Sequence, residues 1–265
     1  NSHWGFDPKE INYVIISHAH IDHIGLLPKL VRDGYTGKII CTPATASLAK
    51  FLLMDSARIQ ESDIKFVNRQ RDKQGREHVE PLYSEDDAAR VIPLLETVSY
   101  GQYHKVDEGI ELLYTDCGHI IGSAAINLRL KENGKEIKLS FSGDLGRYKD
   151  MILRSPQVFP EADYVILEST YGNKIHEPVA SSSNKLLQQI QRTCLEKRGK
   201  LIIPAFSLGR TQEILYMLNR MEIENRLPAL DYYVDSPLSI NITDTVKKYP
   251  DYFNNEVQDM LKKDM

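Results

Sequence analysis

SHAHIDHIG, residues 17–25, places three of the chain's eight histidines and one aspartate within six positions. This group directly follows an apolar, β-branched run, INYVIIS, which predicts a buried strand. His18 and His20 are two positions apart, so in an extended segment their side chains fall on the same side. Asp22 and His23 follow where the spacing becomes helical. Because imidazole and carboxylate are the ligands of hydrolytic zinc sites, the pattern predicts a metal site rather than a polar loop that caps a helix.

The composition bounds the class of protein. A chain of 265 residues with 42% hydrophobic residues can bury a sizeable core in one or two domains. The net charge of −4 gives no global signal for a polyanion partner, so a nucleic-acid surface must be local. The odd, widely spaced Cys41, Cys117 and Cys194 argue for a reducing compartment, which predicts a cytoplasmic location. Without an apolar run of roughly 18 residues or a secretory signal, no membrane partner is expected.

Short β-branched runs alternate with helical spacings along the chain. Two local signals are specific: Ser84 and Asp87 stand in capping-box spacing, and Asn133-Gly134 is a two-residue hairpin turn. The polar, basic residues 69–78 predict a long loop. Helices are expected at 21–34, 44–70, 84–95, 181–199 and 207–221, and strands at 37–43, 109–118, 126–144, 162–171, 200–206 and 231–237.

The pattern after residue 173 alternates helix and strand, which is typical of a parallel α/β unit. We therefore place a domain boundary near residues 173–176. The expected domains are 1–174 and 175–265.

The spacing H-x-H-x-D-H resembles the signature of the metallo-β-lactamase fold, an αββα sandwich of two sheets between helices with metals at one edge. That fold needs further ligands at later strand ends. His119 in DCGHIIGSA and Asp144 in FSGDLG each close a strand-like run. By this resemblance His18, His20 and His119 hold the first metal. Asp22 and His23 hold the second, and Asp144 bridges the two.

Two cations a few ångströms apart generate hydroxide near neutral pH and clamp the attacking and leaving oxygens, which suits phosphodiester hydrolysis. The N/O ligand set favours two zinc ions and is also compatible with manganese. Asp22 is expected to be catalytic as well as a ligand.

Two further stretches, LESTYG (167–172) and IPAFSLGRTQEIL (203–215), resemble motifs of the β-CASP group of metallo-β-lactamase nucleases. The likeness runs over essentially the whole chain and is strongest to the RNA-processing branch, the messenger-RNA 3′-end endonuclease and its prokaryotic relatives. It implies a ribonuclease that hydrolyses single-stranded RNA by attack of a metal-bound hydroxide, in RNA processing or decay. Endonucleolytic and 5′-to-3′ exonucleolytic modes both stay open. It also implies a catalytic role for Glu168.

Substrate contacts are expected at the start of the helix beginning near residue 207. Free backbone N–H groups near Ser207 favour an anion, and Arg210 can add a bidentate phosphate contact. The alternative is a simple cap by Ser207 with Arg210 solvated or in a salt bridge. The aromatic Tyr171, Phe206, Tyr232 and Tyr233 are candidates for base stacking, although a core position is favoured for most of them.

The family pattern is incomplete in this sequence. Strands and an aspartate motif that open the family's domain precede the first residue here. No histidine follows His176, whereas the family has two histidine motifs after its inserted domain. One completes the second metal site and the other acts as general acid. We therefore expect a fragment of a longer protein, with an incomplete second site and little or no activity in isolation.

Two other functions compete with the ribonuclease. A small-molecule metallo-hydrolase of the same fold, acting on a thioester or lactone, would lack the β-CASP-like segment. A non-catalytic RNA-binding scaffold subunit would be expected to have lost ligands from the first histidine motif, which is intact here. The sequence does not decide whether the substrate is RNA or DNA, which bases are preferred or which metal is bound. It is compatible with a homodimer.

Overall fold

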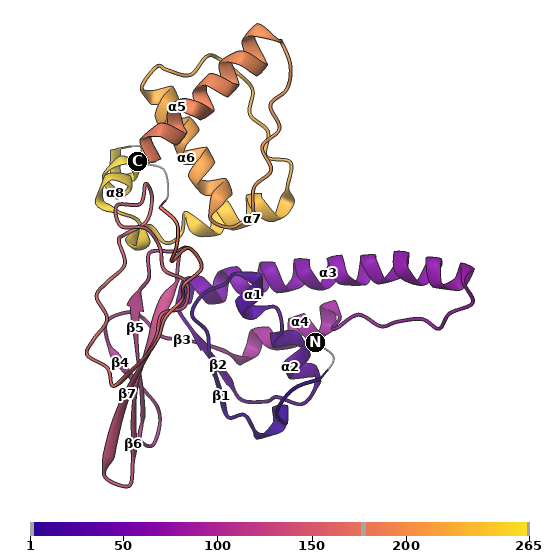
Figure 1. Ribbon diagram of the computed structural model, residues 1–265, viewed down its shortest axis with the longest axis vertical. Helices are drawn as coiled ribbons and strands as arrows, with labels where there is room; N and C mark the ends of the chain where they lie inside the picture. Colours follow the sequence, from indigo (N-terminus) through magenta and orange to yellow (C-terminus); the bar gives the residue numbers. More distant parts are fainter. Residues whose placement is uncertain (1–2, 176–178, 264–265) are drawn as a thin grey trace. The chain divides into compact units, whose positions relative to one another are not determined.

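The computed structural model describes residues 3–175 and 179–263, and these form two compact units (Figure 1). The first unit contains the residues up to Glu168 and those from Asp244 onward, and the second is Ser169–Thr243. The structure thus ends the first unit slightly before the expected boundary near residue 174. It also returns the last part of the chain to the first unit. His176 lies outside the described residues.

A small parallel sheet carries the first histidine motif. Its order is β1 (Tyr13–Ile15), β2 (Lys38–Cys41), β3 (Leu95–Thr97). Each crossover between these strands is helical, as parallel neighbours require. Strand β1 is shorter than the predicted 11–17, although the N–H of Ile16 still donates to the carbonyl of Ile40 at 2.8 Å.

A larger sheet carries the later ligands, with neighbours in chain order and antiparallel except for the last, parallel pair. Its hairpin turn has φ of 51° at Asn133 and 76° at Gly134, both left-handed, as a type I′ turn needs. The predicted hairpin is therefore confirmed. The strands are β4 (Tyr103–Asp107), β5 (Ile110–Asp116), β6 (Ala124–Glu132), β7 (Lys135–Phe141) and β8 (Tyr164–Ile166).

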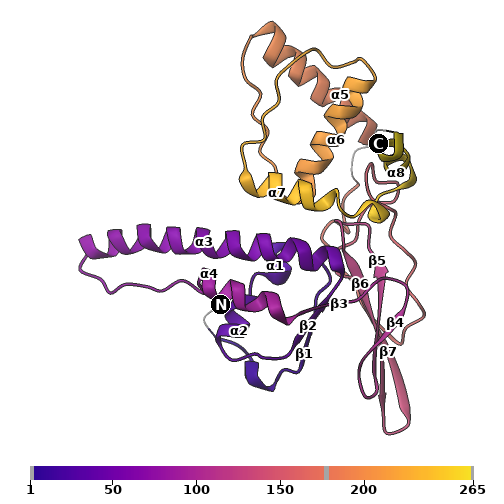
Figure 2. The ribbon, with the colours of Figure 1, turned by 180° about the vertical axis from the view of Figure 1, so that it is seen from behind.

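The two sheets pack face to face around one core. Apolar side chains of β2, β5 and β6, such as Ile40, Leu112 and Ile126, meet between them. Buried Tyr114 also joins the sheets, because its hydroxyl donates to the carbonyls of Ile16 at 3.0 Å and Ile40 at 2.9 Å. Helices α1 (Ile21–Ile24), α2 (Leu27–Arg32), α3 (Pro43–Lys73) and α4 (Glu85–Val91) lie on the other side of the small sheet (Figures 1 and 2). The predicted sandwich of two sheets flanked by helices is confirmed.

Helix α3 corrects the prediction of a loop at 69–78. It continues to Lys73, so Arg69 and Arg71 lie on its last turns. Arginine, lysine and glutamine are good helix formers, which explains why this polar stretch stays helical until Gly75, at φ 63°. Helix α4 begins as predicted: the Ser84 hydroxyl accepts from the Asp87 N–H at 3.2 Å, and the Asp87 carboxylate accepts from the Ser84 N–H at 2.9 Å.

The last part of the chain packs onto the first unit through its own polar contacts. The hydroxyl of Tyr249 lies 2.6 Å from the Ser47 hydroxyl and donates to the carbonyl of Pro43 at 3.1 Å. Phe253 forms an isolated antiparallel bridge with Leu153. These contacts explain why residues from Asp244 onward belong with the first unit.

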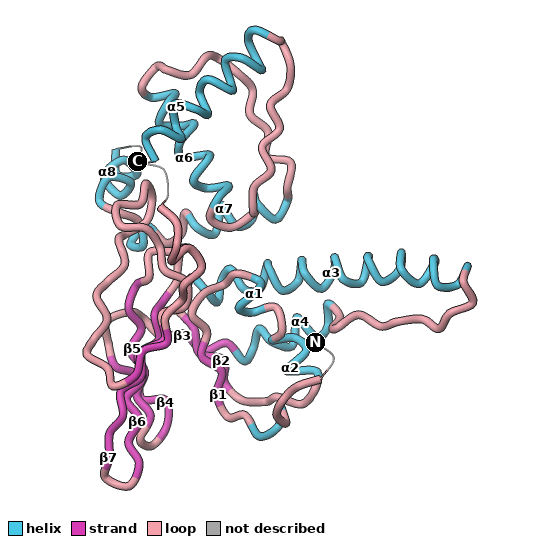
Figure 3. The backbone as a smooth tube through the Cα atoms, in the orientation of Figure 1, coloured by secondary structure: helices cyan, strands magenta, loops and turns pink. Residues whose placement is uncertain are grey.

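The second unit is built from helices and extended segments (Figure 3). The predicted strands 200–206 and 231–237 are not formed; among the described residues of Ser169–Thr243 the structure has no strand, which differs from the expected parallel sheet. A strand needs a hydrogen-bonded neighbour, and here Ile202 and Phe206 stay 85% and 84% exposed. The remaining helices are α5 (Val179–Ile190), α6 (Arg210–Ile223), α7 (Pro237–Val246) and α8 (Asn255–Lys263), with short 3₁₀ or π segments at Pro8–Glu10, Ile92–Leu94, Gln191–Glu196 and Pro250–Tyr252.

Across residues 3–175 and 179–263, no helix has the length and apolar character that a membrane crossing requires.

The tie between the sheets gives a stability prediction. Tyr114→Phe removes a buried hydroxyl that serves two carbonyls, so the free energy of unfolding should fall by about 1–3 kcal/mol. Urea unfolding monitored by circular dichroism measures this, with Tyr103→Phe, on a half-exposed ring, as the control. An equal effect of both substitutions would show that the Tyr114 hydroxyl does not join the sheets.

Candidate metal centre

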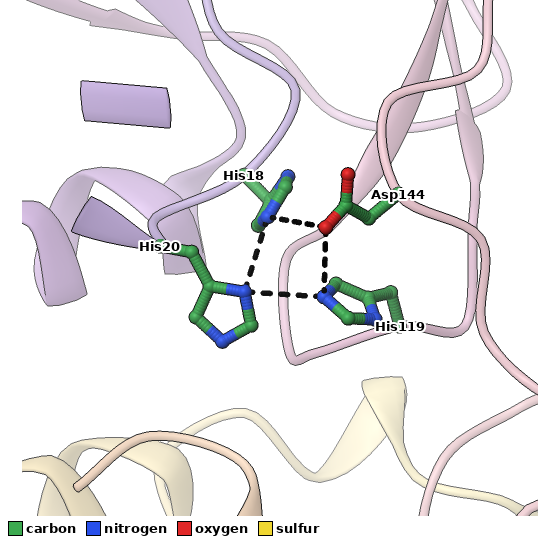
Figure 4. A group of neighbouring side chains, drawn as sticks. All are labelled: His18, His20, His119 and Asp144. Atoms are coloured by element: carbon green, nitrogen blue, oxygen red, sulfur yellow. Dashed lines mark hydrogen bonds and ion pairs between the residues drawn. The ribbon is translucent and has the colours of Figure 1, made fainter. Parts of the chain in front are cut away.

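Three loops at strand ends bring the candidate ligands together (Figure 4). His18 and His20 follow β1, His119 follows β5, and Asp144 follows β7. The N–H of Ala124 donates to the carbonyl of Ser17 at 2.8 Å, which fixes the end of β1 to the start of β6. The loops therefore converge because the two sheets are joined at this edge.

Four ligand atoms lie within 4.8 Å of one another. The Nδ1 atom of His20 is 3.2 Å from Nε2 of His18 and 3.1 Å from Nε2 of His119. The Oδ2 atom of Asp144 is 3.8 Å from Nε2 of His18 and 3.6 Å from Nε2 of His119. Each of the three rings thus turns one nitrogen toward a common centre, and the carboxylate closes the group.

These separations are short enough for one metal ion. Ligands about 2.0–2.1 Å from a zinc ion stand about 3.3 Å apart along the edges of a tetrahedron. Four of the six separations, 3.1–3.8 Å, bracket that value, and all six lie within 4.8 Å. Three imidazole nitrogens and one carboxylate oxygen are also a donor set that zinc accepts. The residues present therefore fit a metal ion.

Burial keeps the imidazoles neutral, which is the form that binds a metal. Desolvation, with neighbouring histidines, lowers the pKa of His18 from 6.5 to about 2, and the His18 side chain is fully buried. Desolvation likewise lowers the pKa of His20 to about 4. The pKa of His119 is lowered mainly by burial, while Asp144 acts in the opposite direction.

Serine residues fix the orientation of two ligands. The Ser17 hydroxyl lies 3.1 Å from Nδ1 of His18, so a proton on Nδ1 leaves Nε2 free to face the centre. The Ser123 hydroxyl accepts from the His119 N–H at 3.1 Å and holds the loop that carries this ligand. Sequence reasoning did not find these serines, because a serine near a histidine carries no specific signal on its own.

Asp22 and His23 form a second group beside the first. Nε2 of His23 lies 3.3 Å from Oδ1 of Asp144 and 3.6 Å from Oδ2 of Asp22. The two oxygens of Asp144 therefore face different groups, which is the arrangement a bridging carboxylate needs. The Asp22 side chain is 73% exposed, so this second group is more open than the first.

Glu168 contacts the loop of Asp144. Its Oε1 accepts from the N–H of Leu145 at 2.9 Å, and its own N–H donates to the Ser142 hydroxyl at 3.0 Å. Glu168 thus spans both sides of Asp144 and fixes the direction of that carboxylate.

The predicted substrate residues Ser207 and Arg210 lie in the second unit, at the start of α6. The Ser207 carbonyl accepts from the Gln212 amide at 3.1 Å, and Gln212 also accepts from the N–H of Gly209 at 2.8 Å. Gln212, not Ser207, therefore caps this helix. Arg210 is 59% exposed and pairs with Glu213 at 2.6 Å.

The chain matches two family models. Residues 2–105 match the model described as Metallo-beta-lactamase superfamily, and residues 211–265 match the one described as Beta-Casp domain. The first match contains the histidine motif, and the second begins just after the start of α6.

Curated proteins are similar over most of the chain. Ribonuclease TTHA0252 of Thermus thermophilus is 33% identical over 96% of this chain, and Endoribonuclease YSH1 of Eremothecium gossypii is 33% identical over 81%. Transcription termination factor FttA of Pyrococcus abyssi is 32% identical over 98%. The matched regions are 53%, 26% and 39% of these proteins, so the chain spans about half of their length or less.

Among solved structures, the subclass B3 metallo-beta-lactamase MEM-A1 from a soil metagenome is similar over 52% of this chain and 43% of its own, with 17% identity and a TM-score of 0.32.

The geometry of the first group predicts metal affinity. Zinc should raise the midpoint of thermal unfolding, and His20→Asn should weaken zinc binding by more than the 10–100-fold typical of residues that only hydrogen-bond a ligand. Competition with a chromophoric chelator measures the affinity. His104→Asn, which removes a histidine outside the group, is the control. Unchanged zinc affinity in His20→Asn would contradict the assignment.

The lowered histidine pKa values predict a pH dependence for the metal-free protein. Between about pH 4 and 6.5 the unfolded chain binds protons at His18 and His20 that the folded chain does not, so the free energy of unfolding should rise with pH. Urea titrations with chelator present at several pH values measure the slope, up to about 1.4 kcal/mol per pH unit for each histidine. His20→Asn should reduce the slope, whereas the exposed-residue variant His78→Asn should not. Equal slopes in all three proteins would contradict this account.

Proposed function

The chain belongs to the metallo-β-lactamase superfamily and its C-terminal part matches the β-CASP domain; from this premise we propose that it is the catalytic part of a metal-dependent ribonuclease. The substrate is single-stranded RNA, and the reaction is hydrolysis of phosphodiester bonds in RNA processing or decay. The names of the Thermus and Eremothecium relatives support this reaction class, and the β-CASP match argues against a small-molecule hydrolase.

The observation that carries the proposal is the convergence of four ligand atoms from three loops. The family and this group of side chains indicate a metal cofactor. We assign His18, His20 and His119 as the residues that would hold a first zinc ion and Asp22 and His23 as those that would hold a second, with Asp144 available to both. Manganese is a compatible alternative. A bound ion would supply hydroxide near neutral pH and stabilise the charge that develops on phosphate.

The chain's own residues have distinct roles in this proposal. The Ser17 hydroxyl sets the tautomer of His18, and Glu168 holds the backbone on both sides of Asp144. Asp22, largely exposed beside His23, is the protein group best placed to accept a proton from incoming water. Among the described residues, the second group contains fewer ligands than the first.

Substrate binding is assigned to the second unit. The predicted aromatic residues are exposed and not buried as expected, since Tyr171, Phe206 and Tyr233 are 57%, 84% and 85% exposed. Exposed rings are stacking platforms for bases. Arg210 would exchange Glu213 for a phosphate, and Ser207 would contact it beside the α6 N-terminus. We keep 1–174 and 175–265 as the two functional domains. The homodimer is not supported by the comparisons, and the cytoplasmic location stays a prediction.

The ribonuclease proposal predicts metal-dependent cleavage. The full-length protein should cut a 5′-labelled, uniform single-stranded RNA, and Asp144→Ala should lower the rate at least about 100-fold because both groups lose a shared ligand. Sequencing gels with and without chelator measure this. A ladder of fragments would indicate an endonuclease, and mononucleotides would indicate an exonuclease. The control is Asp163→Ala, an exposed aspartate bonded to β7 and not to the centre.

The failure modes of this experiment are informative. If the protein binds RNA and metal but does not cleave, the ribonuclease proposal is wrong and the RNA-binding scaffold subunit becomes the favoured function. Cleavage that survives both chelator and Asp144→Ala would contradict the metal mechanism.

A further inference from the structure

An ion pair between buried Asp116 and half-exposed Arg154 lies at the base of the loop that carries His119. The Asp116 side chain is 7% exposed, and its Oδ2 accepts from Nη2 of Arg154 at 2.8 Å and from Nε at 3.1 Å. Its Oδ1 accepts from the N–H of Gly118 at 2.8 Å. One carboxylate therefore bonds both the segment that follows Asp144 and the peptide that precedes His119.

The backbones of these two segments are also in close contact. Gly118 has φ of 60°, and a Cβ atom there would lie 2.4 Å from the carbonyl oxygen of Arg154. Gly146 donates its N–H to the carbonyl of Cys117 at 2.9 Å, and a Cβ on Gly146 would lie 1.8 Å from the carbonyl oxygen of Gly118. The turn before His119 is thus enclosed by residues from both ends of the 146–154 segment.

A second set of contacts secures the other end of the same loop. Tyr100 donates its hydroxyl to the carbonyl of Ser123 at 2.5 Å, and Ser123 in turn accepts from the His119 N–H. The ring of Tyr252 lies 5.4 Å from that of Tyr100 and 5.8 Å from the Arg154 guanidinium. The returning C-terminal segment therefore packs against the arginine of the ion pair.

The ion pair is poorly explained by stability alone. Burial raises the pKa of Asp116 above its ordinary value, so keeping this carboxylate charged costs free energy that Arg154 and the Gly118 N–H must offset. Arg154 is 41% exposed, and water screens a partly exposed ion pair, so its net contribution to stability is small. The contacts also fix orientation, because two guanidinium nitrogens converge on Oδ2 of Asp116 while its Oδ1 accepts from the Gly118 N–H.

We propose that Asp116 and Arg154 are positioning residues for the ligand His119: their ion pair sets the distance between His119 and Asp144 in the first metal site. The inference rests on the metal site of the proposed function. Asp144 lies at the start of the segment that Arg154 anchors, and Nε2 of His119 is 3.6 Å from Asp144 Oδ2. Loss of the ion pair would release His119 from its fixed position, although all four ligand side chains would still be present.

The test is metal affinity and coordination geometry in the full-length protein, with no RNA present. Asp116→Asn keeps the shape of the side chain but removes its charge. We expect zinc affinity, by chelator competition, to fall about 10–100-fold, as it does when groups that orient a ligand are changed. The visible absorption of bound cobalt should weaken or shift, because it reports how many ligands hold the ion. Arg154→Lys, which keeps the charge but not the fork, should give a smaller loss.

The control separates positioning from stability. Asp33→Asn removes another ion-paired carboxylate, which accepts from Trp4 at 2.7 Å and pairs with Lys29, at the end of α2. All variants are compared at a temperature where circular dichroism shows them folded, and Arg154→Lys carries the test if Asp116→Asn does not fold. Zinc affinity and cobalt absorption like those of Asp33→Asn would overturn the proposal. If the variants lose zinc affinity but the unchanged protein never cleaves RNA, the positioning role of Asp116 and Arg154 is supported and only the ribonuclease proposal is contradicted.

Discussion

The hydrogen bond from the Ala124 N–H to the Ser17 carbonyl is the contact on which the site depends, because it joins the two sheets where all three ligand loops begin. Residue 17 ends the run that leads to His18, and residue 124 opens β6 directly after the loop of His119. Gly143 packs so closely on Ser17 that a Cβ atom there would lie 2.7 Å from the serine Cβ. The loop of Asp144 is therefore held at the same point.

This arrangement explains how segments far apart in the sequence form a group a few ångströms wide. Each ligand lies three to five residues beyond a strand, where the sheet fixes the start of the loop that carries it. Polar side chains at that edge then fix the ligand loops by hydrogen bonds: Glu168 holds the loop of Asp144, and Ser123 holds that of His119. Packing in the sandwich core keeps the strands rigid, and the hydrogen bonds fix the orientation of the ligand loops.

Local signals explain which parts of the fold were predictable. Asn133-Gly134 and the Ser84–Asp87 box each depend on two or three neighbouring residues, and both are formed as predicted. The strand prediction at 200–206 is different, because an apolar run becomes a strand only when another strand pairs with it. The end of α3 is another such case, since the same polar residues suit a helix or a loop.

The candidate site shows the same limit. The histidine spacing and the family resemblance that it carries were enough to name the four converging residues, although neither His119 nor Asp144 is a specific signal on its own. Asp116, Arg154 and Ser17 could not be found in this way. Their contacts join residues that are neighbours only in space, or rest on a residue type common beside any loop.

The electrostatics of the group are best explained by a cation. Three imidazoles kept neutral by burial and one carboxylate turn ligand atoms toward one another. Hydrogen bonds among them satisfy only part of this set, since a neutral imidazole has only one N–H to donate. Nε2 of His18 lies 3.2 Å from another imidazole nitrogen and 3.8 Å from a carboxylate oxygen. A metal ion meets the needs of all four atoms at once, which is why the fold can bury so polar a group at the edge of its core.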